Sequence, residues 1–163
     1  MQLLDRLPLA HIGEMEIFNK FITRFDKNDD LEKASVSDIE KLKKELRINI
    51  PNDFELFLTK YGNVYTPDIL DIIVDNEIDL YDVQEFWTTE RIIYDKQNEW
   101  TAQLSTDLIP FASDSMGNIF AFLTSDLKEK KKSSAVYFFD HDFDTVEKLT
   151  DSFSEWIDNY NRI

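Results

Sequence analysis

The stretch "AVYFFDHDFDTVEKL", residues 135–149, contains two runs of strand-forming residues around a loop of alternating aspartates. Asp140, Asp142 and Asp144 are spaced two residues apart, and His141 stands between the first two. Such a pattern is compatible with a metal-binding loop, a catalytic acid/base cluster or the turn of a β-hairpin. Asp and His tolerate turn conformations, and the flanks are β-branched and aromatic, so the hairpin is the favoured interpretation.

The two chemical alternatives lack the residues that they need. In an EF-hand calcium loop that began at Asp140, Thr145 would stand where glycine is required and Asp151 where a bidentate glutamate is required. A hydrolase that uses His141 and a neighbouring aspartate as a base pair is the weakest alternative, because no nucleophile motif accompanies it. The chain has no Cys, and its 3 Gly form no phosphate-binding loop. We therefore expect no metal and no cofactor.

Outward from this stretch, apolar residues at helical spacing predict several helices. Two Ser-x-x-Glu patterns, Ser37 with Glu40 and Ser152 with Glu155, are typical of capping boxes at helix starts. Gly62 is placed to end the third helix. In the fourth helix we expect Phe86, Ile93 and Tyr94 to face inward. The predicted helices cover residues 14–27, 37–46, 51–61, 82–98 and 152–160.

Strand signals occur mainly in the second half of the chain. The pair 108–112 and 119–124 surrounds "SDSMGN", in which Gly117 is expected to take a positive φ. The β-branched run 69–74 predicts another strand, and 78–81 a short one. Helices, then strands, then one C-terminal helix indicate an α+β fold, a mainly antiparallel sheet with helices packed on one face. The length of 163 residues fits a single domain over residues 1–163.

Acidic residues are concentrated in the middle of the chain, whose total net charge is −15. Residues 62–126 hold 13 acidic and 2 basic side chains, a net charge of −11. This balance repels nucleic acid and attracts a basic partner, although acidity also serves solubility alone. The candidate partner-binding residues lie around a predicted strand-to-helix turn and at two hairpin tips: Asp75, Glu77, Asp79, Asp82, Asp114 and Asp142.

The N-terminal sequence "MQLLDRLPLAHIGEM" is interrupted by Asp5, Arg6 and Pro8. It is too short and too polar for a signal peptide or a membrane span. With no Cys in the chain, a cytoplasmic location is the expectation.

Three segments of the chain resemble the SUKH superfamily, which includes a yeast cell-wall-synthesis regulator and many bacterial immunity proteins. They are "INIPNDFELFLTKYGNV" (48–64), "LIPFASDSMGNIFAF" (108–122) and "VYFFDHDFDTVEKLTDSFSEWI" (136–157). The first resembles the family's Pro-x-Asp-aromatic block that ends in Tyr-Gly-Asn. The second is similar to its Pro-Phe-Ala-x-Asp-x-x-Gly-Asn strand–turn–strand. The third looks like its Asp-His strand, return strand and final helix.

The resemblance implies an α+β domain without enzymatic activity. Bacterial members are typically immunity proteins that are encoded beside a toxin, often a nuclease, and neutralise it by binding. It also implies that the pair Asp140 and His141 is structural. The alternative is a regulatory or scaffold module without a toxin partner, as in the yeast member. A nuclease needs a basic substrate groove, so the acidity of the chain gains a meaning as a contact surface.

Because the loop at 140–151 lacks the glycine and glutamate of a calcium site, a calcium titration should give no specific saturable heat. Isothermal calorimetry in the millimolar range checks this. A tight one-to-one isotherm would contradict the prediction.

Overall fold

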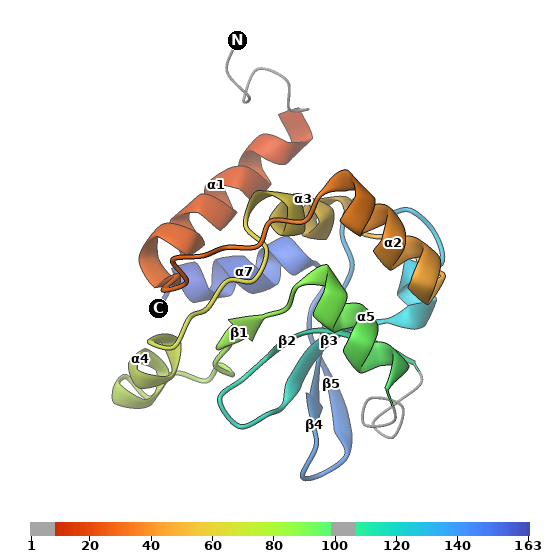
Figure 1. The fold of residues 1–163 in the computed structure, drawn as a ribbon. Coiled ribbons are helices and arrows are strands. Elements are labelled where there is room, and N and C mark those ends of the chain that lie inside the picture. The colour runs from red at the N-terminus through yellow and green to blue at the C-terminus, as the bar shows by residue number, and fades with distance from the viewer. Residues whose placement is uncertain (1–8, 99–106) are drawn as a thin grey trace.

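The computed structural model describes residues 9–98 and 107–163, so Asp5, Arg6 and Pro8 lie outside the described residues. An antiparallel sheet of five strands runs in the order β1-β2-β3-β4-β5, and with the helices it makes the predicted α+β fold (Figure 1). Both predicted hairpins are confirmed. The strands are β1 (Glu85–Phe86), β2 (Leu108–Ser113), β3 (Ile119–Leu123), β4 (Val136–Asp140) and β5 (Thr145–Thr150).

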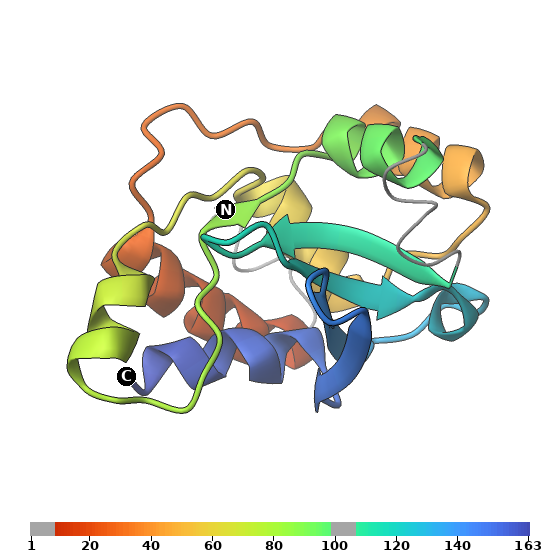
Figure 2. The ribbon, with the colours of Figure 1, turned by 90° about the horizontal axis from the view of Figure 1, so that it is seen from below.

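The helices lie in two groups. α1 and α7 run side by side and, with α3, contact one face of the sheet, whereas α5 is paired with α2 and packs against β2 from the opposite side (Figures 1 and 2). None of the described helices has the length and hydrophobicity to cross a membrane. The helices are α1 (Leu9–Phe25), α2 (Val36–Leu46), α3 (Asn52–Lys60), α4 (Ile69–Asp75), α5 (Thr89–Gln97) and α7 (Phe153–Asn161), with a 3₁₀ turn at Thr124–Leu127.

Aromatic side chains form the centre of the core. Phe153, at the start of α7, is fully buried and its ring contacts Phe54 and Phe57 of α3 at centroid distances of 5.1 and 5.4 Å. Trp156, one turn on, contacts Phe111 of β2 and Phe120 of β3 at 5.6 and 4.8 Å. The inward face predicted for the last helix is therefore confirmed, and it joins the helical layer to the sheet.

The buried carboxylate of Asp53 links α3 to α7. Its Oδ2 atom accepts a hydrogen bond from the Ser154 backbone N–H at 3.1 Å and another from the Ser133 hydroxyl. The same Ser133 oxygen accepts from the backbone N–H of Phe153 at 2.9 Å. The first N–H groups of a helix have no partner within it, so these bonds satisfy donors that would otherwise be buried unpaired.

The predicted strand at residues 69–74 is wrong, because this segment forms helix α4. Its buried residues are Ile69 and Ile73, four apart, whereas Val74 is 63% exposed. This spacing buries one face of a helix rather than alternate sides of a strand. The β-branched residues favour a strand only where a sheet offers a neighbour, and here they pack against the core instead.

The prediction for the next part of the chain also needs correction. Residues 78–81 are irregular rather than a strand, and the predicted helix 82–98 is divided into β1 and the shorter α5. Thr88 starts α5, since its hydroxyl accepts from the Arg91 backbone N–H at 3.1 Å. Phe86 is buried as predicted, but on a strand, and Tyr94 is 65% exposed instead of facing inward.

The capping box of α2 lies two residues earlier than predicted. Ser35 and Asp38 exchange the two bonds, at 3.0 and 2.8 Å, so Ser37 falls inside the first turn. Aspartate serves the box here because its carboxylate reaches the same N–H that glutamate would. At α7 the predicted start is right, as the Ser152 hydroxyl accepts from the Glu155 backbone N–H at 3.1 Å.

Gly62 is needed both for its backbone conformation and for its lack of a side chain. It ends α3 with a φ of 87°. A Cβ atom at this position would lie 2.1 Å from the carbonyl oxygen of Glu32, in the segment that joins α1 to α2. Gly117 also has a positive φ, 85°, as predicted, but a Cβ there would come no closer than 3.8 Å to the His141 ring.

Three glycine-to-alanine variants should therefore differ in the free energy of unfolding, measured by urea denaturation. Gly62→Ala should cost roughly 3 kcal/mol or more, because a positive φ and a steric clash add. Gly117→Ala should cost only about 1–2 kcal/mol, for the positive φ alone. Gly13→Ala, at an open position of α1, should stabilise by up to about 1 kcal/mol. Equal effects at Gly62 and Gly117 would contradict the close approach to Glu32.

The pH dependence of stability should carry a contribution from Asp53. Burial raises the pKa of its carboxyl to about 6 from an ordinary 3.8, against the hydrogen bonds that lower it. The folded protein therefore holds a proton between about pH 4 and 6 that the unfolded chain releases, and this contribution to stability falls as pH rises through that window. Its full size is about 3 kcal/mol, at 1.36 kcal/mol per pKa unit.

Asp53→Asn isolates this contribution, because the amide does not titrate. Chemical denaturation of both proteins between pH 4.5 and 7.5 should show wild type gaining on the variant as the pH falls. A constant offset between the two curves would show that Asp53 titrates at its ordinary pKa.

Candidate interaction site

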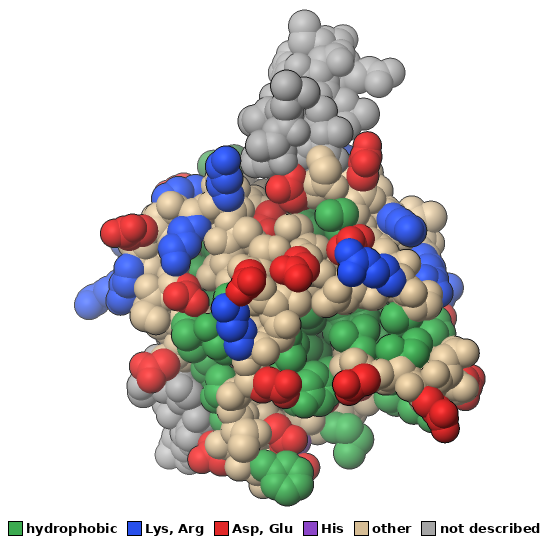
Figure 3. Space-filling model, turned by 180° about the vertical axis from the view of Figure 1, so that it is seen from behind, with side chains coloured by type: hydrophobic (Ala, Val, Ile, Leu, Met, Phe, Trp, Pro, Cys, Tyr) green, Lys and Arg blue, Asp and Glu red, His purple; other side chains and the backbone are tan. Residues whose placement is uncertain are grey.

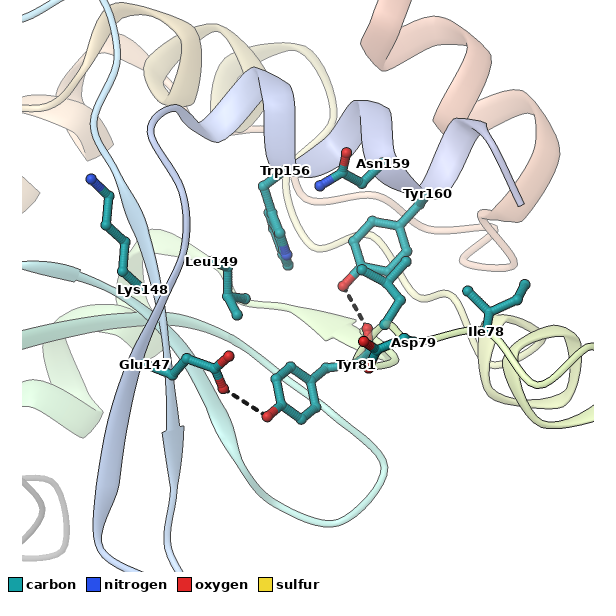
Figure 4. Close-up of a pocket in the computed structure, with 10 residues that line it drawn as sticks. Ile78, Asp79, Tyr81, Glu147, Lys148, Leu149, Trp156, Asn159 and Tyr160 are labelled. Carbon is teal, nitrogen blue, oxygen red and sulfur yellow. Dashed lines mark hydrogen bonds between the residues drawn. The ribbon is translucent and has the colours of Figure 1, made fainter.

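A hollow of about 400 Å³ opens between the irregular segment 78–81, the edge strand β5 and helix α7 (Figure 4). Three interactions of the segment 78–81 form its wall. The Tyr160 hydroxyl donates to the carbonyl oxygen of Tyr81 at 2.7 Å, and the Tyr81 ring stacks on Phe138 of β4 at a centroid distance of 3.8 Å. The Tyr81 hydroxyl in turn donates to the Glu147 carboxylate of β5 at 2.8 Å.

The lining of the hollow combines apolar and polar side chains. Trp156 and Tyr160 reach it from the core side, both fully buried, and Ile78, Leu80 and Leu149 are half-buried around them. Asp79, Glu147 and Asn159 supply polar groups beside them. Sites that take part of another molecule combine apolar surface with placed polar groups in this way.

Negatively charged side chains lie beside the apolar residues of the hollow. Asp79 and Glu147 line the hollow, and its one lysine, Lys148, is paired with Asp151 at 2.6 Å. The hydrogen bond to Glu147, together with the nearby charges of Asp140 and Asp79, raises the pKa of Tyr81. Figure 3 shows this side of the molecule, with a band of hydrophobic side chains and Asp and Glu along its margin. The hollow therefore combines apolar and acidic side chains in its lining.

Of the six predicted contact residues, three on the segment after Val74 are exposed. Asp75 ends α4, Glu77 follows it with a φ of 52°, and Asp79 lines the hollow. These carboxylates make no hydrogen bond or ion pair with a described residue. The three carboxylates are therefore accessible at the surface.

Asp82 and Asp114 have structural contacts instead. Asp82 is buried and accepts from the Ser115 backbone N–H at 3.1 Å, and burial raises its pKa. Asp114 accepts from the backbone N–H groups of Met116 and Asn118 at 2.9 and 2.7 Å. Both therefore fix the loop between β2 and β3.

His141 and Asp142 lie at the tip of the β4–β5 hairpin. The His141 ring Nδ1 is 2.7 Å from the Asn118 side-chain oxygen, which also accepts from the His141 backbone N–H at 3.1 Å. Asp142 is exposed, with one oxygen 3.4 Å from His141 Nε2. The His141 ring therefore bonds locally and joins two hairpin loops.

No group of three or more His, Cys, Asp or Glu in the described part of the chain is arranged to hold a metal ion. The residues that sequence reasoning missed are those of the hollow. Trp156 and Tyr160 were expected in the core, and they are, but nothing in their spacing shows that one end of each borders an opening. Tyr81 and Glu147 come together only through the tertiary fold, which brings the Tyr81 side chain to β4 and β5.

Comparison with known families settles which fold family this is. Residues 33–159 match the family model described as SMI1 / KNR4 family (SUKH-1). The chain belongs to the SUKH-1 family. Members of this family are generally immunity or regulatory domains without catalysis. Among curated proteins no match to the chain was found.

The three segments that resemble the SUKH superfamily contain residues that connect separate parts of the fold. Asp53 of the first segment holds α7, and Gly62 approaches the chain at Glu32. Asn118 of the second segment and His141 of the third bind each other. None of these connecting residues lines the hollow.

Proposed function

We propose that this SUKH-1 protein is a cytoplasmic, non-catalytic immunity protein, acting as one domain, that binds and neutralises a nuclease toxin with a basic contact surface. The observation that carries the proposal is the hollow, whose lining combines the half-buried Leu80 and Leu149 with the acidic Asp79 and Glu147. An acidic protein surface competes with nucleic acid for a basic substrate groove, because both present negative charge to the same Lys and Arg side chains.

Charge distribution supports the same partner. The exposed carboxylates of Asp75, Glu77 and Asp79 follow one another along the segment that leads to the hollow. An electrostatic field of one sign steers an oppositely charged partner and raises the association rate. The apolar side chains of the hollow supply affinity that surface charges alone do not. Asp82 and Asp114 have their internal hydrogen bonds, so we now propose Glu147 in their place. Asp142 stays a proposed peripheral contact.

Neutralising the proposed acidic residues should slow association without unfolding the protein. The variant is Asp75→Asn, Glu77→Gln, Asp79→Asn and Glu147→Gln, with the toxin domain encoded beside this chain as the partner. The wild-type on-rate at low salt should approach about 10⁸ M⁻¹s⁻¹ and fall steeply with salt. In the variant it should fall at least about tenfold at low salt and lose most of its salt dependence.

A matched control removes the same number of charges elsewhere. Glu16→Gln, Asp29→Asn, Asp30→Asn and Glu90→Gln neutralise exposed residues on α1, the following linker and α5. Stopped-flow association at two salt concentrations should separate the two variants. An on-rate indifferent to salt and equal in both would leave the acidity as a device for solubility.

A further inference from the structure

β5 is an edge strand with one side open. It pairs with β4 and, among the described residues, with no other strand. Its residues from Thr145 to Lys148 are exposed, and Val146 keeps 48% of its surface accessible. An unpaired strand edge presents a row of N–H and C=O groups, the template on which an extended peptide adds as a further strand.

The hollow lies directly beside this edge. Glu147, Lys148 and Leu149 of β5 line it, opposite Tyr81 and the α7 residues (Figure 4). In the register with β4, Glu147 is opposite Phe138, so its side chain projects on the face where Tyr81 stacks. Because side chains of a strand alternate between faces, an added strand would direct every second side chain to the face of the hollow.

The chemistry of the hollow selects among possible occupants. Asp79 and Glu147 favour Lys or Arg, and the lining lysine is already neutralised by Asp151. Leu80 and Leu149, half-buried in the lining, offer apolar surface to aliphatic or aromatic side chains. A second copy of this chain is a poor occupant, since two proteins of net charge −15 repel each other and their acidic borders would meet.

We propose that an extended segment of the partner, with basic and apolar side chains in alternation, adds to the free edge of β5. Its main chain continues the sheet, its apolar side chains enter the hollow, and its Lys or Arg contacts Asp79 and Glu147. This rests on the proposed function in one respect, that the partner is a polypeptide with a basic surface. It goes further in naming the edge, the conformation of the bound segment and its pattern.

The test uses the full chain and a phage-displayed library of random 12-residue peptides. Panning should enrich peptides that alternate Lys or Arg with apolar residues and lack proline in the central positions. Synthetic copies should bind wild type, and the affinity should fall at least tenfold in Asp79→Lys and in Glu147→Lys. The matched controls Glu90→Lys, on α5, and Val36→Asp, an exposed apolar residue of α2, should bind as wild type does.

Amide hydrogen exchange supplies a backbone readout that side-chain docking would not give. On binding, amides of residues 145–149 should slow by at least tenfold, and those of α2 should not change. Enrichment of no peptide, binding that is unaffected by both lysine variants, or exchange unchanged in β5 would each overturn the proposal. So would a free chain that sedimentation shows to be a dimer broken by Glu147→Lys, because the edge would then belong to a second copy.

The two proposals fail in different ways. If the neighbouring toxin domain binds and loses affinity on neutralisation of the acidic residues, while β5 exchange stays unchanged, the immunity function stands and strand addition falls. If the peptides bind at β5 and no basic toxin domain does, strand addition stands, and the partner belongs to a regulatory system instead.

Discussion

The carboxylate of Asp53 fixes the relation between two helices on which the core depends. It is 1% exposed, and its oxygen accepts from the first turn of α7 both directly, at Ser154, and through Ser133. These bonds place Phe153 against α3 and the sheet. Burial of a charge is costly, and here burial outweighs the hydrogen bonds in raising the carboxyl pKa. The protein therefore spends stability at neutral pH to obtain a defined helix geometry.

Small polar side chains and glycines also connect other distant parts of the chain. Asn63 accepts from the Glu32 backbone N–H at 2.7 Å, next to the close approach of Gly62. Asn118 holds the β2–β3 loop through Asp114 and the β4–β5 loop through His141. Small polar side chains and glycines are suited to these positions because they satisfy or approach backbone without filling the core. Gly62, Asn63, Asn118 and His141 all lie in the segments that carried the family resemblance.

Sequence patterns predicted those elements whose structure is determined by local interactions. The two hairpins, the α3 end at Gly62 and the inward face of α7 follow from alternation, turn residues and helical spacing, and all were predicted. Residues 69–74 failed because their preference for strand is expressed only with a strand neighbour, which the tertiary fold does not provide. β1 escaped notice since two residues carry no periodic pattern.

The candidate site was less predictable for a different reason. Charge along the chain identified Asp75, Glu77 and Asp79, yet charge alone does not tell an exposed carboxylate from one such as Asp82, which is bound to the Ser115 backbone. The hollow itself arises where the side chains of segment 78–81 meet β4, β5 and α7. Tyr81 is fixed there by its hydrogen bond to Glu147, 66 residues away in the sequence, and by stacking on the ring of Phe138, contacts that no local pattern encodes.

The division between residues that hold the fold and residues that face outward has a functional consequence. Asp53, Asp82 and Asp114 accept hydrogen bonds within the protein, so replacing them leaves buried donors unpaired and costs stability. Asp75, Glu77 and Asp79 carry no such bond, and substitutions at exposed positions of this kind usually change stability by less than about 0.5 kcal/mol. These exposed residues can therefore vary in charge and shape, because the internally hydrogen-bonded residues keep the fold intact. A protein that must match one particular partner needs this arrangement, because specificity is then adjusted without refolding the domain.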